Sequence, residues 1–384
     1  MSALSQEERT TRRIRRYIIA LIVFATGMWD LSNLHTFVQS PYPSILNKTI
    51  HIQRKFSDSI QLNVQRGLNI INVCSGQHVA AWIYDGFESL SPGLRYWEDE
   101  PLEKMLSGPE DAAKMQDGDT IWVSYTKLEE FSRDFLPYIN TTFALITTYV
   151  GRLPTGIELL APGITAHEYL LGWFATNIGK YTGGYQFHPK VFPFPLGLKS
   201  RMGYKSFQNP LPAYRKLFLE LWNETRHNET KFQASKAINI FAGQISSTND
   251  VRKSIPSGKR LDYAEYIKRL AKAKYVLSPD GIHPDCHRHY EAIGLGAIPI
   301  TQLDPYLYSH LKGGPVIYQN DNWDMEQLNS ILPMDLNSPA RRMINRNLIF
   351  EEYWMEYVES KTGRALRWWD LTQRKKAMLS DFEL

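Results

Sequence analysis

Hydrophobic residues in the first half of the chain form short continuous runs separated by polar or helical stretches. The predicted strands are residues 68–74, 120–124 and 142–147, and a helical stretch covers 127–136. The spacing of apolar residues also predicts a helix over 168–176, and a short strand within 190–198 leads into an irregular loop. Continuous apolar strands alternating with helices are typical of a parallel sheet covered on both faces.

The second half repeats this rhythm after a predicted helix over 213–227 and a polar run that ends at Lys236. The predicted elements are strand 237–242, helix 263–273, strand 274–278, helix 286–295 and strand 297–301. We therefore expect an α/β protein with two Rossmann-like domains, residues 67–230 and 231–335. Two such domains predict a cleft between them, with ligands beyond the carboxyl ends of the strands.

An uncharged run from Tyr17 to Trp29 follows a cluster of five arginines near the start of the chain. About twenty apolar residues are needed to cross a membrane, so the predicted span extends over 17–37. It would leave 1–16 as a cytosolic tail, 38–66 as a stem and the rest of the chain in the lumen. A cleaved signal peptide is the competing interpretation, although no small-x-small cleavage site follows Trp29.

Composition adds limits to this picture. The chain has 384 residues, a formal charge of +4 and 43% hydrophobic residues, which suits globular domains and offers no basic face for nucleic acid. Its two cysteines, Cys74 and Cys286, permit a disulfide without requiring one and exclude a cysteine scaffold. Four glycosylation sequons fit a lumenal route; they begin at Asn47, Asn140, Asn223 and Asn228.

The stretch from Tyr275 to Ile300 contains the most informative pattern. A strand leads through a turn at 279–281 to a helix, with Asp285 as the expected N-cap and Gly296 as the left-handed residue that ends it. Helix N-termini attract anions such as a diphosphate, and Arg288 adds a full charge in the first turn. Glu291 lies one turn further on, where its carboxylate can accept both ribose hydroxyls. The alternative is that Arg288 and Glu291 form a solvated i,i+3 ion pair.

This region resembles the donor-binding half of exostosin-type glycosyltransferases, glycosyltransferase family 47 and its relatives. The resemblance covers about residues 238–301. The matching residues are Phe241-Ala-Gly243, Arg252, Tyr266 to Leu270, Ser278-Pro-Asp-Gly281, Asp285-Cys-His-Arg288, Glu291-Ala292 and Gly296-Ala-Ile-Pro299. Upstream, residues 172–177 and 188–197 are similar to the N-terminal halves of relatives, with much less specific motifs.

The resemblance implies a GT-B fold and an inverting transfer from a UDP-sugar, with no cofactor required. It implies that Glu291 holds the ribose, that Arg288 and Arg252 face the diphosphate, and that Gly243 allows close approach of the backbone. The donor-binding prediction also includes Ser278, Gly281 and His287. The turn over 280–284 departs from the family pattern, which leaves the sugar unidentified.

An inverting transfer also needs a base for the acceptor hydroxyl. We expect it in the N-terminal half, with His78 as the first candidate, then Asp85 and Glu168, although for each of them the commoner role is that of an ordinary loop or capping residue. Asp117-Gly-Asp119 has the spelling of a metal-binding Asp-x-Asp, but it precedes a strand, so we interpret it as a turn and predict no metal. His283, His287 and His289 do not share one helical face.

The sequence therefore predicts a glycosyltransferase of the Golgi or endoplasmic reticulum membrane. It would be a single-pass type II protein with a nucleotide-sugar donor and a glycan or glycoprotein acceptor. Aromatic residues from Trp354 to Trp369 predict that the C-terminal helices, within 336–384, pack back across both domains. A catalytically silent sugar-nucleotide-binding or scaffold subunit is the alternative, and a nucleotide-sugar epimerase a weaker third.

Overall fold

A computed structural model describes part of the chain, all of it within the unit Arg66–Leu384. The described residues are 79–84, 105–148, 157–178, 188–198, 211–227, 234–248, 252–253, 255, 257–304, 308, 311, 317–318, 323–324, 326, 328, 330 and 346–369. The predicted tail, signal-anchor, stem and strand 68–74 lie outside them. Among the helices in these ranges, none is long and apolar enough to cross a membrane.

The first sheet has six parallel strands in the order β2-β1-β3-β4-β5-β6. They are β1 (Trp82–Tyr84), β2 (Met105–Leu106), β3 (Asp119–Ser124), β4 (Phe143–Thr148), β5 (Leu170–Ala175) and β6 (Val191–Pro193). All residues of β3 and β4 are buried, as expected of central strands in a covered parallel sheet. The strands predicted over 120–124 and 142–147, and the short one within 190–198, are confirmed.

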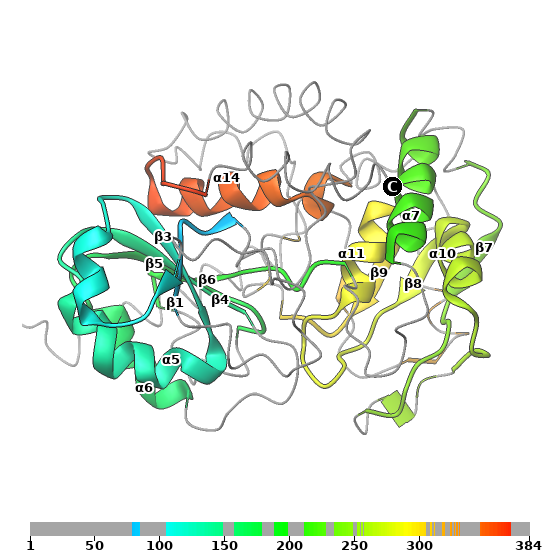
Figure 1. Cartoon of the computed structure of the whole chain (residues 1–384). Helices are drawn as coiled ribbons and strands as arrows, with labels where there is room; N and C mark the ends of the chain where they lie inside the picture. The colour runs from blue at the N-terminus through cyan, green and yellow to red at the C-terminus, as the bar shows by residue number, and fades with distance from the viewer. Residues whose placement is uncertain are drawn as a thin grey trace, which may run out of the picture. The chain divides into compact units, whose positions relative to one another are not determined.

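Helices cover both faces of this sheet (Figure 1). On one face lie α5 (Leu128–Glu130), which continues as a π-helical turn over Phe131–Phe135, and α6 (Ile157–Ala166). On the other face lies α14 (Glu351–Thr362), which packs on β5. The predicted helical stretch 127–136 is confirmed, although its turns are of mixed type.

The predicted helix over 168–176 is wrong, because these residues contain strand β5. Both faces of β5 are buried: the Trp173 Nε1 donates to Thr147 Oγ1 of β4 at 2.9 Å, and the Phe174 ring stacks on Phe192 of β6. A strand covered on both faces needs no polar residue at alternate positions. Its apolar run therefore matches helical spacing as well as strand spacing.

The second sheet has four parallel strands in the order β10-β9-β8-β7. They are β7 (Ile238–Phe241), β8 (Ala273–Leu277), β9 (Ile298–Thr301) and β10 (Ile317–Tyr318). The strands predicted over 237–242, 274–278 and 297–301 are confirmed as β7, β8 and β9. The protein is thus an α/β protein with two parallel sheets, compatible with Rossmann-like folds.

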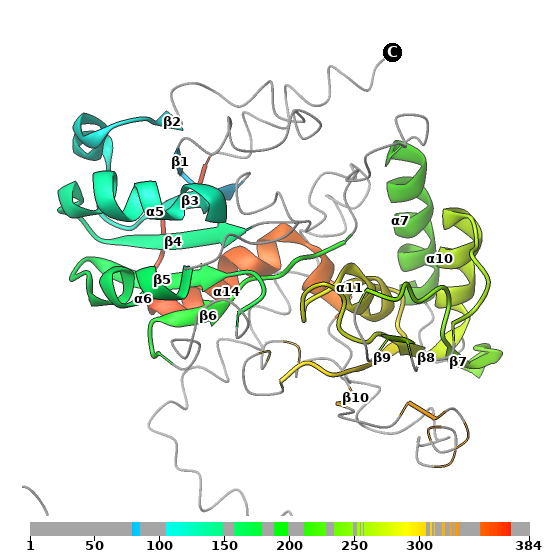
Figure 2. The same ribbon diagram turned by 90° about the horizontal axis from the view of Figure 1, so that it is seen from below.

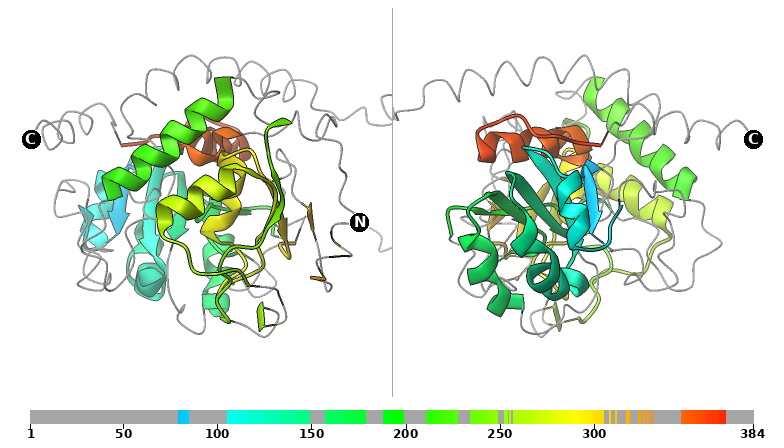
Figure 3. Two further views of the ribbon diagram at one scale, coloured as in Figure 1. Left: turned by 90° about the vertical axis from the view of Figure 1, so that its right-hand side faces the viewer. Right: turned by 60° about the vertical axis from the view of Figure 1, so that its left-hand side comes forward.

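Three helices accompany the second sheet: α7 (Leu211–His227), α10 (Tyr263–Ala271) and α11 (His287–Gly294). Figure 2 shows them together on one side of the strands, and α7 runs beside α10 in Figure 3. The predicted helices over 213–227, 263–273 and 286–295 are confirmed. The other side is packed by a buried cluster that includes Ile245, Ile255, Trp323 and Leu328.

A buried lysine connects two helices and a strand at the amino edge of the second sheet. The side chain of Lys236 is almost fully enclosed, and its ammonium donates to the carbonyls of Ala271, Ala273 and Leu295 at 2.9, 2.8 and 3.2 Å. These carbonyls belong to the end of α10, the start of β8 and the end of α11. A buried ammonium is tolerated only when its donors are satisfied, so Lys236 locks the three elements together.

The C-terminal part of the described chain contacts elements of both sheets. A 3-10 turn over Arg346–Ile349 packs on α11, and α14, which follows it, packs on β5. Trp354 of α14 is buried and lies against the Phe194 ring that follows β6. Residues 346–362 therefore contact both α11, which accompanies the second sheet, and β5 of the first sheet.

Candidate functional site

Arg288 lies in the first turn of α11, at the carboxyl ends of β7 and β8. Its Nη1 donates to the carbonyls of Ala242 and Leu277 at 2.8 and 3.1 Å, and its Nη2 donates to Gln244 at 2.6 Å. The guanidinium also lies 5.7 Å from the centre of the Tyr266 ring, within range of a cation–π contact. The guanidinium is therefore held by three backbone carbonyls and also interacts with the Tyr266 side chain.

Arg252 holds the turn that follows β8. Its Nε donates to the carbonyl of Asp280 at 2.5 Å and its Nη2 to that of Pro279 at 2.8 Å. Gly281 lies beside it, and a Cβ at that position would come within 3.3 Å of Nη2. The two arginines predicted to face a diphosphate are therefore both at the carboxyl edge of the second sheet, where they stabilise backbone carbonyls.

Glu291 connects α11 to α10 through two tyrosines. Its Oε1 accepts from Tyr263 Oη at 2.5 Å and its Oε2 from Tyr266 Oη at 2.9 Å. The residue is only 3% exposed, so the solvated ion pair with Arg288 is not formed. A carboxylate has about four acceptor positions, so ribose hydroxyls would have to share Glu291 with the tyrosines. Its role as the ribose ligand stays a prediction.

The start of α11 differs from the predicted capping. Cys286 is the N-cap residue, and its side chain makes no capping hydrogen bond, so the prediction of Asp285 as N-cap is wrong. The Asp285 carboxylate instead accepts from the backbone N–H of Leu196 and the hydroxyl of Tyr290, both at Oδ2. The end of the helix is as predicted, because Gly296 has a φ of 66°.

His287 also contacts the segment that follows β6. Its Nδ1 donates to the carbonyl of Gly197 at 2.9 Å. The first turn of α11 is therefore contacted by protein on the side of the first sheet, and His287 is held there as a positioning residue. Gly243, after β7, has a φ of 60°, a conformation that glycine adopts without strain.

Ser278, Cys286 and His289 form a polar cluster at the base of the same turn. The His289 Nδ1 lies 2.7 Å from Ser278 Oγ, and the His289 Nε2 lies 3.5 Å from the free Cys286 thiol. Burial lowers the pKa of His289, but the neighbouring Cys286 reverses this and raises it to about 9. Burial raises the pKa of the Cys286 thiol, whereas His289 and Ser278 more than offset it, so that it lies below 9.0. The cluster favours a thiolate beside an imidazolium.

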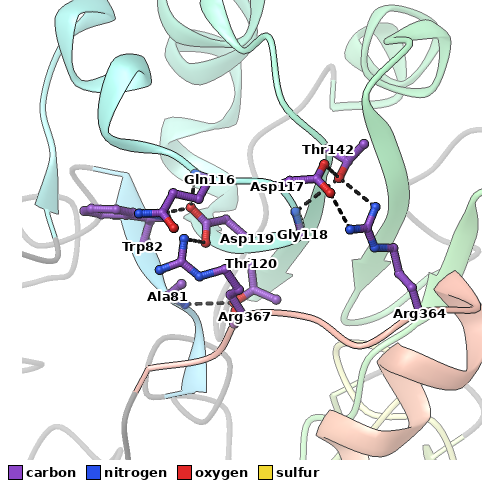
Figure 4. A network of polar contacts seen from close by, with 10 residues as sticks. All are labelled: Ala81, Trp82, Gln116, Asp117, Gly118, Asp119, Thr120, Thr142, Arg364 and Arg367. Carbon is purple, nitrogen blue, oxygen red and sulfur yellow. Dashed lines mark hydrogen bonds and ion pairs between the residues drawn. The ribbon is translucent and has the colours of Figure 1, made fainter.

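The Asp117-Gly-Asp119 segment forms a turn at the amino end of β3, as predicted (Figure 4). Gly118 has a φ of 83°. Asp117 accepts from the hydroxyl of Thr142 and from Arg364, and Asp119 accepts from Trp82 Nε1 and the backbone N–H of Gln116, with Arg367 3.4 Å away. Both carboxylates are therefore used by donors of the protein, on the edge opposite the carboxyl ends of the strands.

The predicted bases His78 and Asp85 lie outside the described residues. Glu168 is exposed in the turn before β5. It therefore lies at the amino edge of the first sheet, at the other end of the strand from the carboxyl edge.

Of the sequon residues, Asn140 and Asn223 are exposed, and Asn47 and Asn228 lie outside the described part. Within that part, no group of three or more His, Cys, Asp or Glu side chains could hold a metal ion.

Loops from both sheets meet around Asp285, and we call this meeting place the inter-sheet junction. The backbone N–H of Asp285 donates to Asn177 Oδ1 at 3.1 Å, and Leu196 N–H donates to Asp285 Oδ2 at 2.9 Å. The hydroxyl of Tyr308 donates to the carbonyl of Ile178 at 3.2 Å. Asn177 follows β5, Leu196 follows β6, Asp285 follows β8 and Tyr308 follows β9. The carboxyl sides of two parallel sheets therefore come together here.

Sequence reasoning did not identify Asn177 as a site residue, although one signal was present. Asn177 directly follows the buried strand β5 and has a φ of 56°, a left-handed conformation that asparagine tolerates better than most residues. An Asn at the end of an apolar run was therefore the available sign of a special turn.

No protein-family model matches this sequence, and the search of curated proteins gives no match.

Proposed function

We propose that the protein is a glycosyltransferase that binds a nucleotide-sugar, with a UDP-sugar as the expected donor. The observation that carries the proposal is the inter-sheet junction, where loops after β5 and β6 meet loops after β8 and β9. In open parallel α/β sheets, ligands bind beyond the carboxyl ends of the strands. Two sheets that share one such edge suit a transfer between two bound substrates, as in the GT-B fold that the resemblance implies.

The electrostatics of the second sheet support a phosphate-bearing donor. Arg288 and Arg252 both lie at the carboxyl edge of β7 and β8, next to the start of α11. Burial lowers the pKa of Arg288, but Tyr266, Cys286 and Glu291 raise it above its ordinary value, so the guanidinium stays charged. Guanidinium groups beside a helix N-terminus are well suited to a diphosphate.

The membrane anchor and the lumenal, Golgi-type location belong to the same proposal. They are supported by the sequence of residues 17–37 and by the sequons, of which Asn140 and Asn223 lie on the surface. The silent subunit is the second candidate, because both carboxylate oxygens of Glu291 accept hydrogen bonds from tyrosine hydroxyls of the protein itself.

Isothermal titration of the full chain in mild detergent with UDP and with GDP tests the donor site. We expect UDP to bind. Arg288→Gln should raise the dissociation constant for UDP about 10- to 100-fold, because it removes one charge-assisted contact. Arg269→Gln is the matched control, since Arg269 is half exposed and pairs with Glu265 on α10. The control should bind UDP as the wild type does.

The same protein is then incubated with a panel of UDP-sugars, and released UDP and sugar are measured. UDP release would support a transferase, binding without turnover across the panel would favour the silent subunit, and release of an altered sugar would indicate an epimerase. A wild-type chain that binds neither UDP nor GDP at millimolar concentration would overturn the proposed function.

A further inference from the structure

The inter-sheet junction contains an asparagine with unused hydrogen-bonding capacity. Asn177 is 1% exposed, and its Oδ1 accepts from the backbone N–H of Asp285. That bond fixes the orientation of the amide, because an N–H donor needs the oxygen. The Nδ2 then has no acceptor among the described residues, although it is fully buried. Native proteins pair the great majority of such groups, so this donor requires an explanation.

Asp285 provides the complementary half. It is 2% exposed, and its Oδ2 accepts from Leu196 N–H at 2.9 Å and Tyr290 Oη at 2.8 Å. Its Oδ1 is buried and has no donor within the described part of the chain. A buried polar atom without a partner destabilises the folded protein, so the unused oxygen and the unused amide are unfavourable unless a ligand pairs with them.

Further strain and polarity lie at the same place. The neighbouring Thr176 is fully buried, and its Oγ1 has no partner within the described ranges. Asn177 has a left-handed φ of 56°, a conformation that is retained mainly where the surroundings impose it, often at functional sites. Unpaired buried groups and strain therefore coincide at the carboxyl end of β5.

A hydroxyl group matches this arrangement, since it can donate its proton to Asp285 Oδ1 and accept from Asn177 Nδ2. We propose that Asp285 is the catalytic base of the transfer and that Asn177 holds the oxygen of the reacting hydroxyl. This inference rests on the proposed function. Both side chains are closed to solvent here, so the hydroxyl enters when the loops after β5 and β8 separate, as lobes and lids commonly do around substrates.

The proposed step balances in atoms and charge. The acceptor oxygen forms a bond to the anomeric carbon of the donor sugar, and the bond from that carbon to the phosphate oxygen breaks. The electron pair of the broken bond leaves with UDP, and the acceptor proton moves to Asp285 Oδ1. In the absence of a sugar acceptor, water occupies the same place and is activated in the same way, which gives slow hydrolysis of the donor.

The charges around Asp285 suit a base. Burial raises the pKa of its carboxyl above 3.8, while His289 and the donors from Leu196, Tyr290 and Cys286 oppose this without reversing it. The titratable neighbours on its own side are Cys286, His289 and Tyr290, and Tyr308 approaches from beyond β9. A base with a raised pKa has a greater affinity for the hydroxyl proton. Turnover should fall as the pH drops through the pKa of Asp285, which lies above 3.8, because the protonated carboxyl cannot accept the hydroxyl proton.

The test compares Asp285→Asn with the wild type in UDP release, both by hydrolysis and by transfer to added sugar acceptors. We expect turnover in both assays to fall about 10²- to 10⁴-fold, the usual contribution of a general base. The dissociation constant for UDP should stay within about twofold, because Asp285 does not contact the phosphates in this proposal. Asp262→Asn is the matched control, since asparagine also caps a helix and Asp262 caps α10.

Two variants of Asn177 keep the test decisive if Asp285→Asn folds poorly. Asn177→Gly keeps the left-handed backbone and removes the amide, and Asn177→Asp keeps the Oδ1 acceptor and removes the donor. Both should lower turnover at least about 10-fold, with UDP binding retained. Wild-type turnover in Asp285→Asn, or in both Asn177 variants, would overturn the base assignment alone. A wild type that binds no nucleotide would overturn the proposed function, and this inference with it.

Discussion

Two buried aspartates lie at opposite edges of the structure and have very different surroundings. Asp119, at the amino end of β3, is fully buried and has Trp82, Gln116 and Arg367 as partners (Figure 4). Asp285, at the carboxyl side of the junction, is nearly as deeply buried and, like Asp119, has an Oδ1 without a hydrogen-bond donor; burial raises the pKa of its carboxyl. The difference is that the Arg367 guanidinium lies 3.4 Å from Asp119 Oδ1, whereas Asp285 forms no ion pair within the described residues, and we propose a chemical role only for Asp285.

The largest effect on stability is expected from Asp119→Ala. This change leaves the half-buried Trp82 Nε1 and the backbone N–H of Gln116 without their acceptor and removes the partner of Arg367. We expect a loss of about 2–4 kcal/mol in the free energy of unfolding, measured by urea denaturation. Asp117→Ala, which affects an exposed pair with Arg364, should change the urea midpoint far less. If both variants lost the same stability, the buried Asp119 would contribute no more to the fold than the exposed Asp117.

The junction edge should instead show chemical reactivity. In a Cys74→Ser background, we expect Cys286 to react with iodoacetamide at pH 7 about 10-fold faster than an ordinary thiol, because its pKa is lowered by His289. His289→Asn should remove the acceleration, as followed by intact mass spectrometry. His283→Asn, in the same turn but outside the cluster, is the control. An ordinary rate for the wild type would show that Cys286 is a protonated thiol.

The smallest effect concerns Asp285→Asn and pH. The folded-state pKa of Asp285 is above 3.8, so its ionisation weakens the folded protein as pH rises from 3.8 through that value. Asparagine does not ionise, so the variant does not lose stability in this way. The free energy of unfolding of the variant relative to wild type, measured by urea denaturation, should therefore be greater at pH 7 than at pH 4. A pH-independent difference would mean that the pKa of Asp285 is not raised in the folded protein.

Much of the fold could be predicted from local patterns. The strand–turn–helix–strand unit over 273–301 follows from its apolar runs and from Gly296, because each signal is local and all agree. The prediction failed at β5, where burial on both faces removes the polar alternation that distinguishes a strand. The short strands β1 and β2 were not predicted, since strands of two or three residues carry no periodicity.

The candidate site was only partly accessible to sequence reasoning. Arg288 could be found because it lies in the first turn of a recognisable helix, and Arg252 because it belongs to the family resemblance; both lie at the same edge of the sheet. The pairing of Asn177 with Asp285 could not, because 108 residues separate them and no local pattern reports a contact between two sheets. The capping error at Asp285 has the same origin, since its carboxylate is drawn to Leu196 in the other half of the chain.

The last described residues complete the first sheet from the opposite end of the chain. Arg367 N–H donates to Gly118 O, Trp369 N–H donates to Val79 O, and Thr120 Oγ1 donates to Arg367 O. During synthesis, these hydrogen bonds can therefore form only after residues 367–369 have left the ribosome. A chain truncated before residue 366 would leave Gly118 O and Val79 O without these donors, although it would keep every residue of the proposed site.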